Sequence, residues 1–347
     1  MIWPQLYLCV ALTTLATLLL ELALTRLFSV VFYYHFAFLA ISIALFGLGA
    51  GGVFSYVVAS GQGSLLRRLG WISTLNAGLV VVMLGLVLRQ RDLSAGSLAL
   101  LYVVTALPFF LAGTVVSIAI SETIERVDRV YFFDLVGAAA GCLLLVPLLN
   151  QFGGPNTIIA AAVLFAASAS LWHNMAGSVT GRIFSVAFAL ALTGLIILNW
   201  RSQLLDVRYA KGQRLSDEMY VKWNSFSRIA VAKEKESGQI QIVIDADAST
   251  GIANFDFANL SERDRRDLLF QGPALPYAVR PGAKTLIIGP GGGWDVARAL
   301  ASGSRDVTGV EINRLIARTV MLDVFPHLSR NLYRRPDVRI VVEEGRS

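Results

Sequence analysis

Seven apolar stretches, each close to twenty residues long, dominate the first 200 residues. A helix rises about 1.5 Å per residue, so about 20 apolar residues match the ~30 Å hydrocarbon core of a bilayer. The first stretch is too long for a removable signal peptide and lacks its basic start and cleavage site. We therefore predict an α-helical membrane domain with about seven spans over residues 1–200. The predicted spans are Gln5–Arg26, His35–Ala59, Trp71–Leu88, Ser97–Ser121, Tyr131–Leu149, Pro155–Trp172 and Arg182–Trp200.

The charge composition changes near residue 200. Residues 1–200 contain 8 Lys/Arg and 6 Asp/Glu, whereas residues 201–347 contain 22 and 18, as expected of a soluble region. Basic residues are interspersed with acids, which does not favour nucleic-acid binding. Cys9 and Cys142 lie in apolar stretches, so we expect neither a disulfide framework nor a metal site. The basic residues Arg201, Arg208, Lys211 and Arg214 favour a cytoplasmic C-terminal region.

Four polar residues, Glu21, Arg26, His35 and Asp134, fall within or near the predicted spans. Because an unpaired charge in hydrocarbon costs at least about 2.5–3.5 kcal/mol, they need partners or a function. One interpretation is a proton or substrate pathway. The other is a structural ion pair, Glu21 with Arg26 or Asp134 with Arg26. The structural interpretation is favoured, because transport pathways usually contain more such groups.

The glycine-rich segment Gly47–Gly52 resembles a nucleotide-binding loop, but it lies inside an apolar stretch and no strand precedes it. The spacing of Gly47 and Gly51 instead suits close approach of two helices in lipid. Gly137 and Gly141 repeat this spacing. We predict that both pairs pack helices together.

The soluble region begins with strand-like segments. Arg228–Ala232 and Gln239–Ile244 are rich in β-branched residues, and the turn-like Glu236–Gly238 between them predicts an antiparallel β-unit. Ser261–Phe270 has helical spacing with a capping serine at its start. The prolines that follow, Pro273, Pro276 and Pro281, predict a linker.

An ordered series of elements follows the linker. Its order of strand, glycine loop, helix, strand and terminal acid is typical of the front half of a Rossmann-type nucleotide-binding domain. The glycines let backbone approach a ligand, and the acid can bind ribose hydroxyls. The predicted elements are the strand Thr285–Ile288, the loop Gly289–Gly293, the helix Trp294–Ser302, the strand Asp306–Glu311, the helix Ile312–Phe325 and the strand Val338–Val342.

The loop itself indicates the ligand class. A dinucleotide fingerprint that starts at Gly289 requires a third glycine where this chain has Trp294, which argues against NAD or FAD. A G-x-G-x-G loop followed by Glu311 suits an S-adenosyl ligand, which has no phosphate to bind.

These residues resemble the spermidine synthase (polyamine aminopropyltransferase) superfamily, and more narrowly its membrane-fused bacterial members. The resemblance is carried by Ile288–Val296, Gly309–Asn313, Pro336–Arg339 and Glu343–Arg346, and by the β-unit segments Trp223–Ile229 and Ile242–Asp245. In the membrane half, Tyr131–Gly141 is similar to an aspartate-containing span of those fused proteins.

The resemblance implies a bacterial inner-membrane protein that binds S-adenosylmethionine or decarboxylated S-adenosylmethionine without a metal. It implies that Gly289, Gly291 and Gly293 line the ligand, that Glu311 holds its ribose and that Glu344 reads the adenine amine. The acceptor would be a polyamine or another small amine.

The chain also departs from the family pattern. Where the family has a tyrosine-glutamine pair, this chain has Phe226–Ser227, and where the family has an aspartate in the glycine loop, this chain has Gly292. The family's Tyr-His-Glu motif is not visible around Phe270–Tyr277. The family's catalytic aspartate follows a fourth strand, whereas this sequence stops at Ser347, so no catalytic residue is assigned. Three parallel strands leave an apolar face uncovered, and we expect further polypeptide to follow.

The predicted organisation is a membrane domain (residues 1–200), a small β-unit with linker (201–282) and a partial Rossmann-type domain (283–347). Three functions remain open. The first is an S-adenosyl-dependent aminopropyl- or methyltransferase in the membrane. The second is a non-catalytic membrane subunit whose degenerate synthase-like domain docks onto other subunits of a complex. The third, less favoured, is a transporter that uses Glu21, Arg26 or Asp134.

Overall fold

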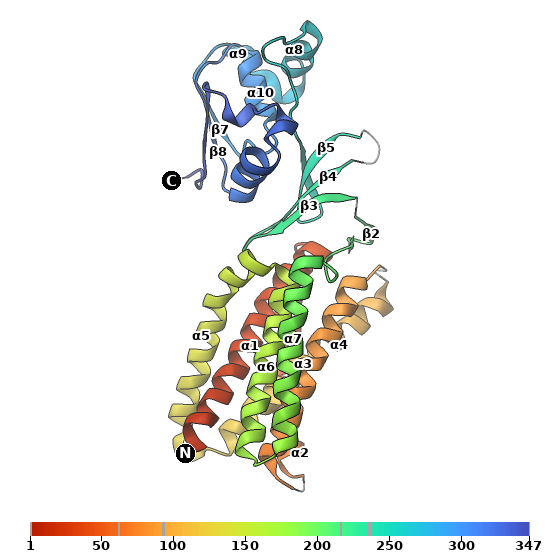
Figure 1. Ribbon diagram of the computed structural model, residues 1–347, viewed down its shortest axis with the longest axis vertical. Helices are drawn as coiled ribbons and strands as arrows, with labels where there is room; N and C mark the ends of the chain where they lie inside the picture. Colours follow the sequence, from red (N-terminus) through yellow and green to blue (C-terminus); the bar gives the residue numbers. More distant parts are fainter. Residues whose placement is uncertain (1, 62, 92–93, 216, 235–237, 347) are drawn as a thin grey trace. The chain divides into compact units, whose positions relative to one another are not determined.

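The computed structural model describes residues 2–61, 63–91, 94–215, 217–234 and 238–346, and Figure 1 shows the course of the chain. Its internal contacts divide the chain into two compact units. The first, the membrane unit, comprises Met1–Leu215 with Trp223–Ser227. The second, the sheet unit, comprises Ser216–Lys222 with Arg228–Ser347.

Seven helices among the described residues are long and apolar enough to span a membrane. Each coincides with one of the predicted apolar stretches, which confirms the predicted spans and makes the chain an integral membrane protein. The helices are α1 (Ile2–Val31), α2 (Phe36–Ala59), α3 (Leu65–Arg89), α4 (Ala95–Ser121), α5 (Val127–Phe152), α6 (Gly154–Met175) and α7 (Val179–Ser202), with a 3₁₀ turn η1 (Ile124–Arg126) before α5.

Glycines bring pairs of these helices into close contact. A Cβ added at Gly47 of α2 would lie 2.7 Å from the carbonyl oxygen of Ala106 in α4, and one at Gly51 would overlap the Phe110 carbonyl. On α5, Gly137 and Gly141 approach the backbone of α1 in the same way. The predicted packing role of both glycine pairs is therefore confirmed.

Replacing Gly51 with alanine is expected to lower the thermal stability of the purified protein in detergent. The added methyl group has to push α2 away from α4, and overpacking of this kind costs about 1–3 kcal/mol. Gly49→Ala is the matched control, because a Cβ there meets no atom within 4 Å. We expect a clear drop in Tm for Gly51→Ala alone, and equal Tm values for both variants would contradict this packing.

Beyond α7 the chain forms a short antiparallel ladder of β1 (Tyr209–Ala210) and β2 (Gln213–Arg214), still in the membrane unit. The segment Trp223–Ser227 also belongs to this unit. The indole of Trp223 packs on the glycine turn between α5 and α6, and the Ser225 backbone N–H donates to Asn150 Oδ1 (2.8 Å).

The sheet unit contains an antiparallel sheet in the order β3-β4-β5-β6, apart from Trp223, the last residue of β3, which belongs to the membrane unit. The predicted strand pair is confirmed, since Ile229 is paired with Ile244 across β4 and β5. Most of the predicted turn at 236–238 lies outside the described residues. Two further strands flank the predicted pair. The four strands are β3 (Glu218–Trp223), β4 (Arg228–Lys233), β5 (Ile240–Ile244) and β6 (Ala248–Gly251).

A buried ion pair joins β3 to β4. The Arg228 side chain is fully buried, and its two terminal nitrogens each donate to a carboxylate oxygen of Glu218 at 2.7 Å. The Arg228 backbone N–H donates to Asp245 Oδ1 (2.7 Å). Paired, hydrogen-bonded charges of this kind tolerate burial, whereas removal of one partner typically costs about 3–5 kcal/mol.

Helix α8 (Glu262–Leu269) begins as predicted, because Ser261 Oγ accepts a hydrogen bond from the Asp264 backbone N–H (3.0 Å). The proline-rich stretch predicted as a linker instead forms a 3₁₀ turn, η2 (Gly272–Ala274), and a short helix, α9 (Leu275–Val279). Pro273 and Pro276 occupy the first turns of these elements, where a missing backbone N–H costs no hydrogen bond.

A three-stranded parallel sheet follows, in the order β7-β8-β9. Its strands and the helix α10 match the predicted elements. The helix predicted over 312–325 is present as η3, which is a π-helix in which the Phe325 N–H donates to the Val320 carbonyl. The elements are β7 (Thr285–Ile288), α10 (Trp294–Ala301), β8 (Val307–Val310), η3 (Leu315–Val324), the 3₁₀ turns η4 (Pro326–Ser329) and η5 (Leu332–Arg334), and β9 (Val338–Val341).

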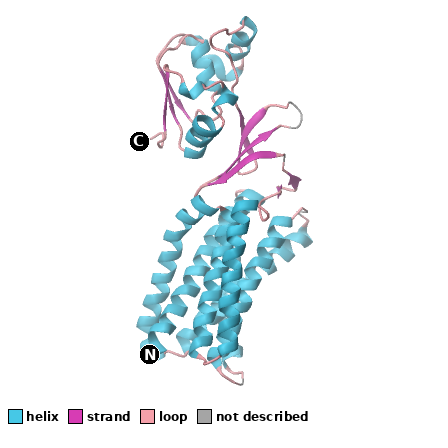
Figure 2. Cartoon of the chain, in the orientation of Figure 1, coloured by secondary structure: helices cyan, strands magenta, loops and turns pink. Residues whose placement is uncertain are grey.

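One hydrophobic core joins the two sheets of this unit. It contains Ile229 and Ile242 from the antiparallel sheet together with Ile287, Val296 and Val320 from the parallel part. Figure 2 shows the helices gathered on one side of the parallel strands.

On the other face of the parallel sheet, the apolar side chains of β7 are uncovered. Ile287 of β7 is buried, whereas its neighbours Leu286 and Ile288 are 65% and 68% exposed. The uncovered apolar face expected from three strands is therefore present.

Candidate functional site

The loop between β7 and α10 is built on glycines with positive φ. Gly289, Gly291 and Gly293 have φ values of +72°, +53° and +90°. L-residues with a Cβ rarely adopt this region, so the sharp strand-to-helix turn depends on glycine. At Gly292 a Cβ would overlap the Gly251 carbonyl, and there the close approach of the two chain segments excludes a side chain.

Glu311 places a buried carboxylate directly beside this loop. It follows β8 and is only 5% exposed. Its Oε2 accepts from the Gly291 backbone N–H (3.2 Å), and its Oε1 accepts from the Asn313 backbone N–H (2.9 Å). The structure therefore brings Glu311 together with the glycines identified from the sequence.

The N–H groups of the three positive-φ glycines are all used inside the protein. Gly289 donates to the Val310 carbonyl (2.8 Å), Gly293 to the Pro290 carbonyl (2.8 Å) and Gly291 to Glu311. A phosphate-binding loop instead points such N–H groups at its anion. These three groups are therefore not directed at an external phosphate.

The side chain of Tyr333 also holds the glycine loop in place, and no sequence pattern predicted this role. The side chain is buried, and its hydroxyl donates to the Gly291 carbonyl (2.8 Å). Burial, and secondarily the charge of Glu311, raises the pKa of Tyr333 above its usual range. Tyr333 follows η3 without any periodic pattern, so no sequence signal indicates this contact.

The antiparallel sheet also contacts the glycine loop. The segment that follows β6 crosses the loop, and the Ala253 backbone N–H donates to the Gly292 carbonyl (2.9 Å). The Thr250 side chain lies against Gly291. Both sheets of this unit therefore help to shape the loop.

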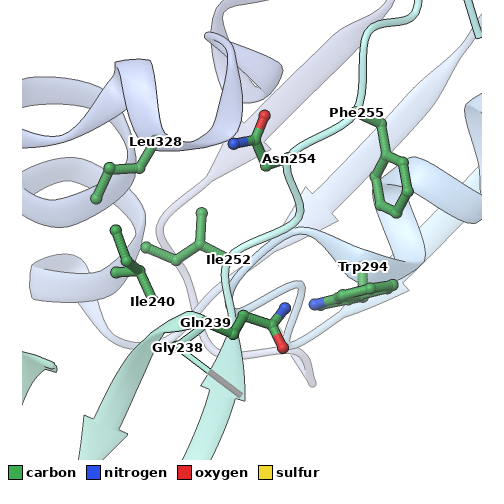
Figure 3. Close-up of a pocket in the computed structure, with 8 residues that line it drawn as sticks. All are labelled: Gly238, Gln239, Ile240, Ile252, Asn254, Phe255, Trp294 and Leu328. Carbon is green, nitrogen blue, oxygen red and sulfur yellow. The ribbon is translucent and has the colours of Figure 1, made fainter. Parts of the chain in front are cut away.

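A cavity of about 330 Å³ opens beside the first residue of α10. Figure 3 shows Trp294 and Phe255 on one side of it, with the amides of Gln239 and Asn254 nearby. The two rings pack edge to face, with centroids 5.4 Å apart. Apolar walls with a few polar groups are typical of a small-molecule site, and this volume is at the low end for such sites.

A second polar cluster lies on α10. Asp295 forms an ion pair with Arg298 (2.9 Å), and its charge acts on the nearby Tyr277. Burial, followed by the charge of Asp295, raises the pKa of Tyr277 to about 12. Tyr277 therefore stays protonated at neutral pH.

Glu344 is placed differently from Glu311. Its side chain is 54% exposed and lies 3.9 Å from Arg346. The adjacent residue, Gly345, packs on Ile288 at the end of β7, so this segment passes the edge of the sheet where the glycine loop begins.

The polar residues of the membrane unit do not form the predicted ion pairs. In the described part of the chain, neither Glu21 nor Asp134 is paired with Arg26, whose Nη1 donates to Ser29 Oγ (3.0 Å). The helical spacing of α1 puts Glu21 and Arg26 five residues apart, which turns their side chains to different faces. His35 precedes α2 and stacks on Tyr33 (centroids 5.7 Å apart).

Among the described residues, no group of three or more His, Cys, Asp or Glu side chains is arranged to hold a metal ion. Comparison of the chain with protein-family models, curated proteins and solved structures finds no match.

Tyr333→Phe is expected to lower the free energy of unfolding of the sheet unit by about 1–3 kcal/mol at neutral pH, because the Gly291 carbonyl loses its donor. The raised pKa makes this difference depend on pH. The folded chain keeps the tyrosine proton where the unfolded chain loses it, so the stabilisation is complete below about pH 10 and declines at higher pH.

Denaturant titrations of both proteins in detergent between pH 8 and 11 test this prediction. The stability difference between wild type and Tyr333→Phe should shrink above about pH 10, by up to about 1.4 kcal/mol per pH unit. A difference that stays constant over this range would show that Tyr333 is not held protonated by its surroundings.

Proposed function

We propose that the protein is an integral-membrane, S-adenosyl-dependent transferase related to the spermidine synthases. The observation that carries this proposal is the contact between Glu311 and Gly291. In Rossmann-type domains, a glycine loop after one strand and an acid after the next hold a nucleoside, with the acid on the ribose. The contact puts both elements at the same edge of the parallel sheet.

The hydrogen bonds of the loop favour an S-adenosyl ligand over a dinucleotide. The N–H groups of Gly289, Gly291 and Gly293 are already used within the chain, and an S-adenosyl ligand has no phosphate that needs them. Each Glu311 oxygen accepts one backbone hydrogen bond. Because a carboxylate offers about four lone-pair sites, capacity remains for two ribose hydroxyls.

The reaction in this proposal transfers a methyl or aminopropyl group from S-adenosylmethionine or its decarboxylated form to a polyamine or another small amine. The amine nitrogen attacks the carbon attached to the sulfonium. A C–N bond forms, the C–S bond breaks with its electron pair left on sulfur, and a general base takes the amine proton. No described residue is assigned as this base. The basic residues that follow α7 support a cytoplasmic location for the sheet unit at a bacterial inner membrane.

Glu311→Gln is expected to weaken binding of the S-adenosyl ligand by at least about tenfold, because hydrogen bonds to a charged group contribute about 1.5–3 kcal/mol each. Isothermal titration calorimetry on the full chain in detergent, with S-adenosylmethionine and its decarboxylated form, measures this change. Titration with ATP and NAD should give no heat of binding, and tight binding of either would contradict the ligand class.

Asp306→Asn provides the matched control. Asp306 lies at the opposite end of β8 and makes an ion pair with Lys284 (3.0 Å), in which both side chains are well exposed. Exposed pairs contribute little to stability, so this variant should bind like wild type. Equal affinities of wild type and Glu311→Gln would remove the proposed ribose contact.

The uncovered face of β7 supports a second candidate, a non-catalytic subunit of a membrane complex. Leu286 and Ile288 of β7 are 65% and 68% exposed on this face. Exposed apolar surface of this kind is found at protein–protein contact sites. In this alternative the glycine loop is a rigid structural element, and the face of β7 docks onto another subunit.

The docking candidate predicts that Leu286→Ser lowers the apparent mass of the complex measured in mild detergent by light scattering. Leu275→Ser on α9, where the leucine is also exposed (67%), is the control and should leave the mass unchanged. A monomeric wild-type chain that transfers a methyl or aminopropyl group to an amine would exclude this candidate.

A further inference from the structure

A cavity of about 700 Å³ in the membrane unit lies at the end of α3. Its apolar lining includes Val82 and Leu86 of α3 and Leu204, which follows α7. These three side chains are 57%, 42% and 54% exposed. A Cβ at Gly85, between them, meets no atom within 4 Å. The apolar side of the cavity, here called the apolar groove, therefore lies along the C-terminal end of the membrane-spanning helix α3.

The polar side of the same cavity, here called the arginine rim, is strongly basic. Of the residues that the structure describes, Arg89, Arg91, Arg208 and Arg214 line it, together with the acid Asp206. Arg89 is the last residue of α3, and Arg214 lies in β2. Four guanidinium groups around one opening create a site that favours an anion.

These arginines retain hydrogen-bonding capacity for a ligand. Among the described residues, Arg89, Arg208 and Arg214 make no ion pair or hydrogen bond through their side chains. The Arg91 guanidinium stacks on the ring of Tyr209, 4.4 Å from its centroid. Stacking fixes the plane of the guanidinium while its N–H edge remains available to a phosphate.

The apolar groove and the arginine rim together indicate the class of ligand. An apolar groove along a span with a basic rim at its end matches a molecule with acyl chains and an anionic phosphate headgroup. A free phosphate ion would leave the apolar groove without a function, and a zwitterionic lipid would bring a second, positive charge to the arginines. We propose that this cavity binds an anionic phospholipid, with its phosphate at the arginine rim and one acyl chain along α3.

The thermal stability of the full chain in detergent, measured with added lipid, tests the proposal. Phosphatidylglycerol should raise the Tm in a saturable manner, whereas phosphatidylcholine and inorganic phosphate should not. Arg208→Gln/Arg214→Gln should raise the half-saturating phosphatidylglycerol concentration by about tenfold or more, because each interfacial basic residue contributes substantially to anionic-lipid binding. High salt should weaken the wild-type effect as well.

Two further variants keep the test independent of folding defects. Arg201→Gln removes an arginine at the end of α7 that does not line the cavity, and it should respond to phosphatidylglycerol like wild type. Gly85→Leu fills the apolar groove without changing charge, and it should reduce the phosphatidylglycerol effect. Circular dichroism without lipid confirms that each variant is folded.

Three outcomes would overturn the proposal. The first is an equal phosphatidylglycerol response in wild type and in Arg208→Gln/Arg214→Gln. The second is an equal response to phosphatidylcholine, which would indicate general solvation by lipid. The third is a full response to inorganic phosphate alone, which would identify a site for a free anion.

Discussion

The hydrocarbon core of the bilayer requires every backbone polar group to find its partner within the protein, and this requirement shapes the first half of the chain. Helices satisfy their backbone internally, and hydroxyl side chains follow the same rule. Thr13 Oγ1 donates to the Cys9 carbonyl one turn back (2.8 Å) and also lies 3.0 Å from Ser168 Oγ on α6. Once polar groups are satisfied in this way, helix contacts depend on how closely the backbones approach, and glycines allow this approach between α2 and α4 and between α5 and α1.

The sheet unit is stabilised in a different way. Its two sheets share one core, and its main buried charge, Arg228, is neutralised by a carboxylate from the neighbouring strand. The glycine loop is held on several sides, by Glu311, by Tyr333 and by the segment after β6. A loop that is fixed before a ligand arrives does not have to be ordered on binding, so less of the interaction energy is lost.

Sequence patterns predicted the parts of this structure that depend on local composition. The spans, the strand pair of β4 and β5, the capping serine of α8 and the order of β7, α10 and β8 all follow from hydropathy or turn chemistry. The proximity of Glu311 to the glycines also followed, because adjacent parallel strands end at the same sheet edge.

Contacts between residues distant in the sequence could not be predicted in this way. Tyr333 reaches Gly291 across 42 positions, and the segment after β6 reaches Gly292 from another sheet. Hydropathy predicted a helix at η3 but did not reveal its π-winding. The basic cavity at the end of α3 combines residues on either side of four intervening helices, and the sequence indicates only an orientation signal for two of its arginines, Arg208 and Arg214.

The path of the chain between the two units has a consequence for dissecting the protein. The chain enters the sheet unit at residue 216, returns to the membrane unit for Trp223–Ser227 and leaves it again at residue 228. A fragment that starts at residue 228 would contain the buried guanidinium of Arg228 without Glu218, its counter-ion. A fragment that starts earlier would carry the indole of Trp223 without the glycine turn on which it packs. The change in composition near residue 200 therefore does not mark a point at which the soluble part can be separated as an intact folding unit.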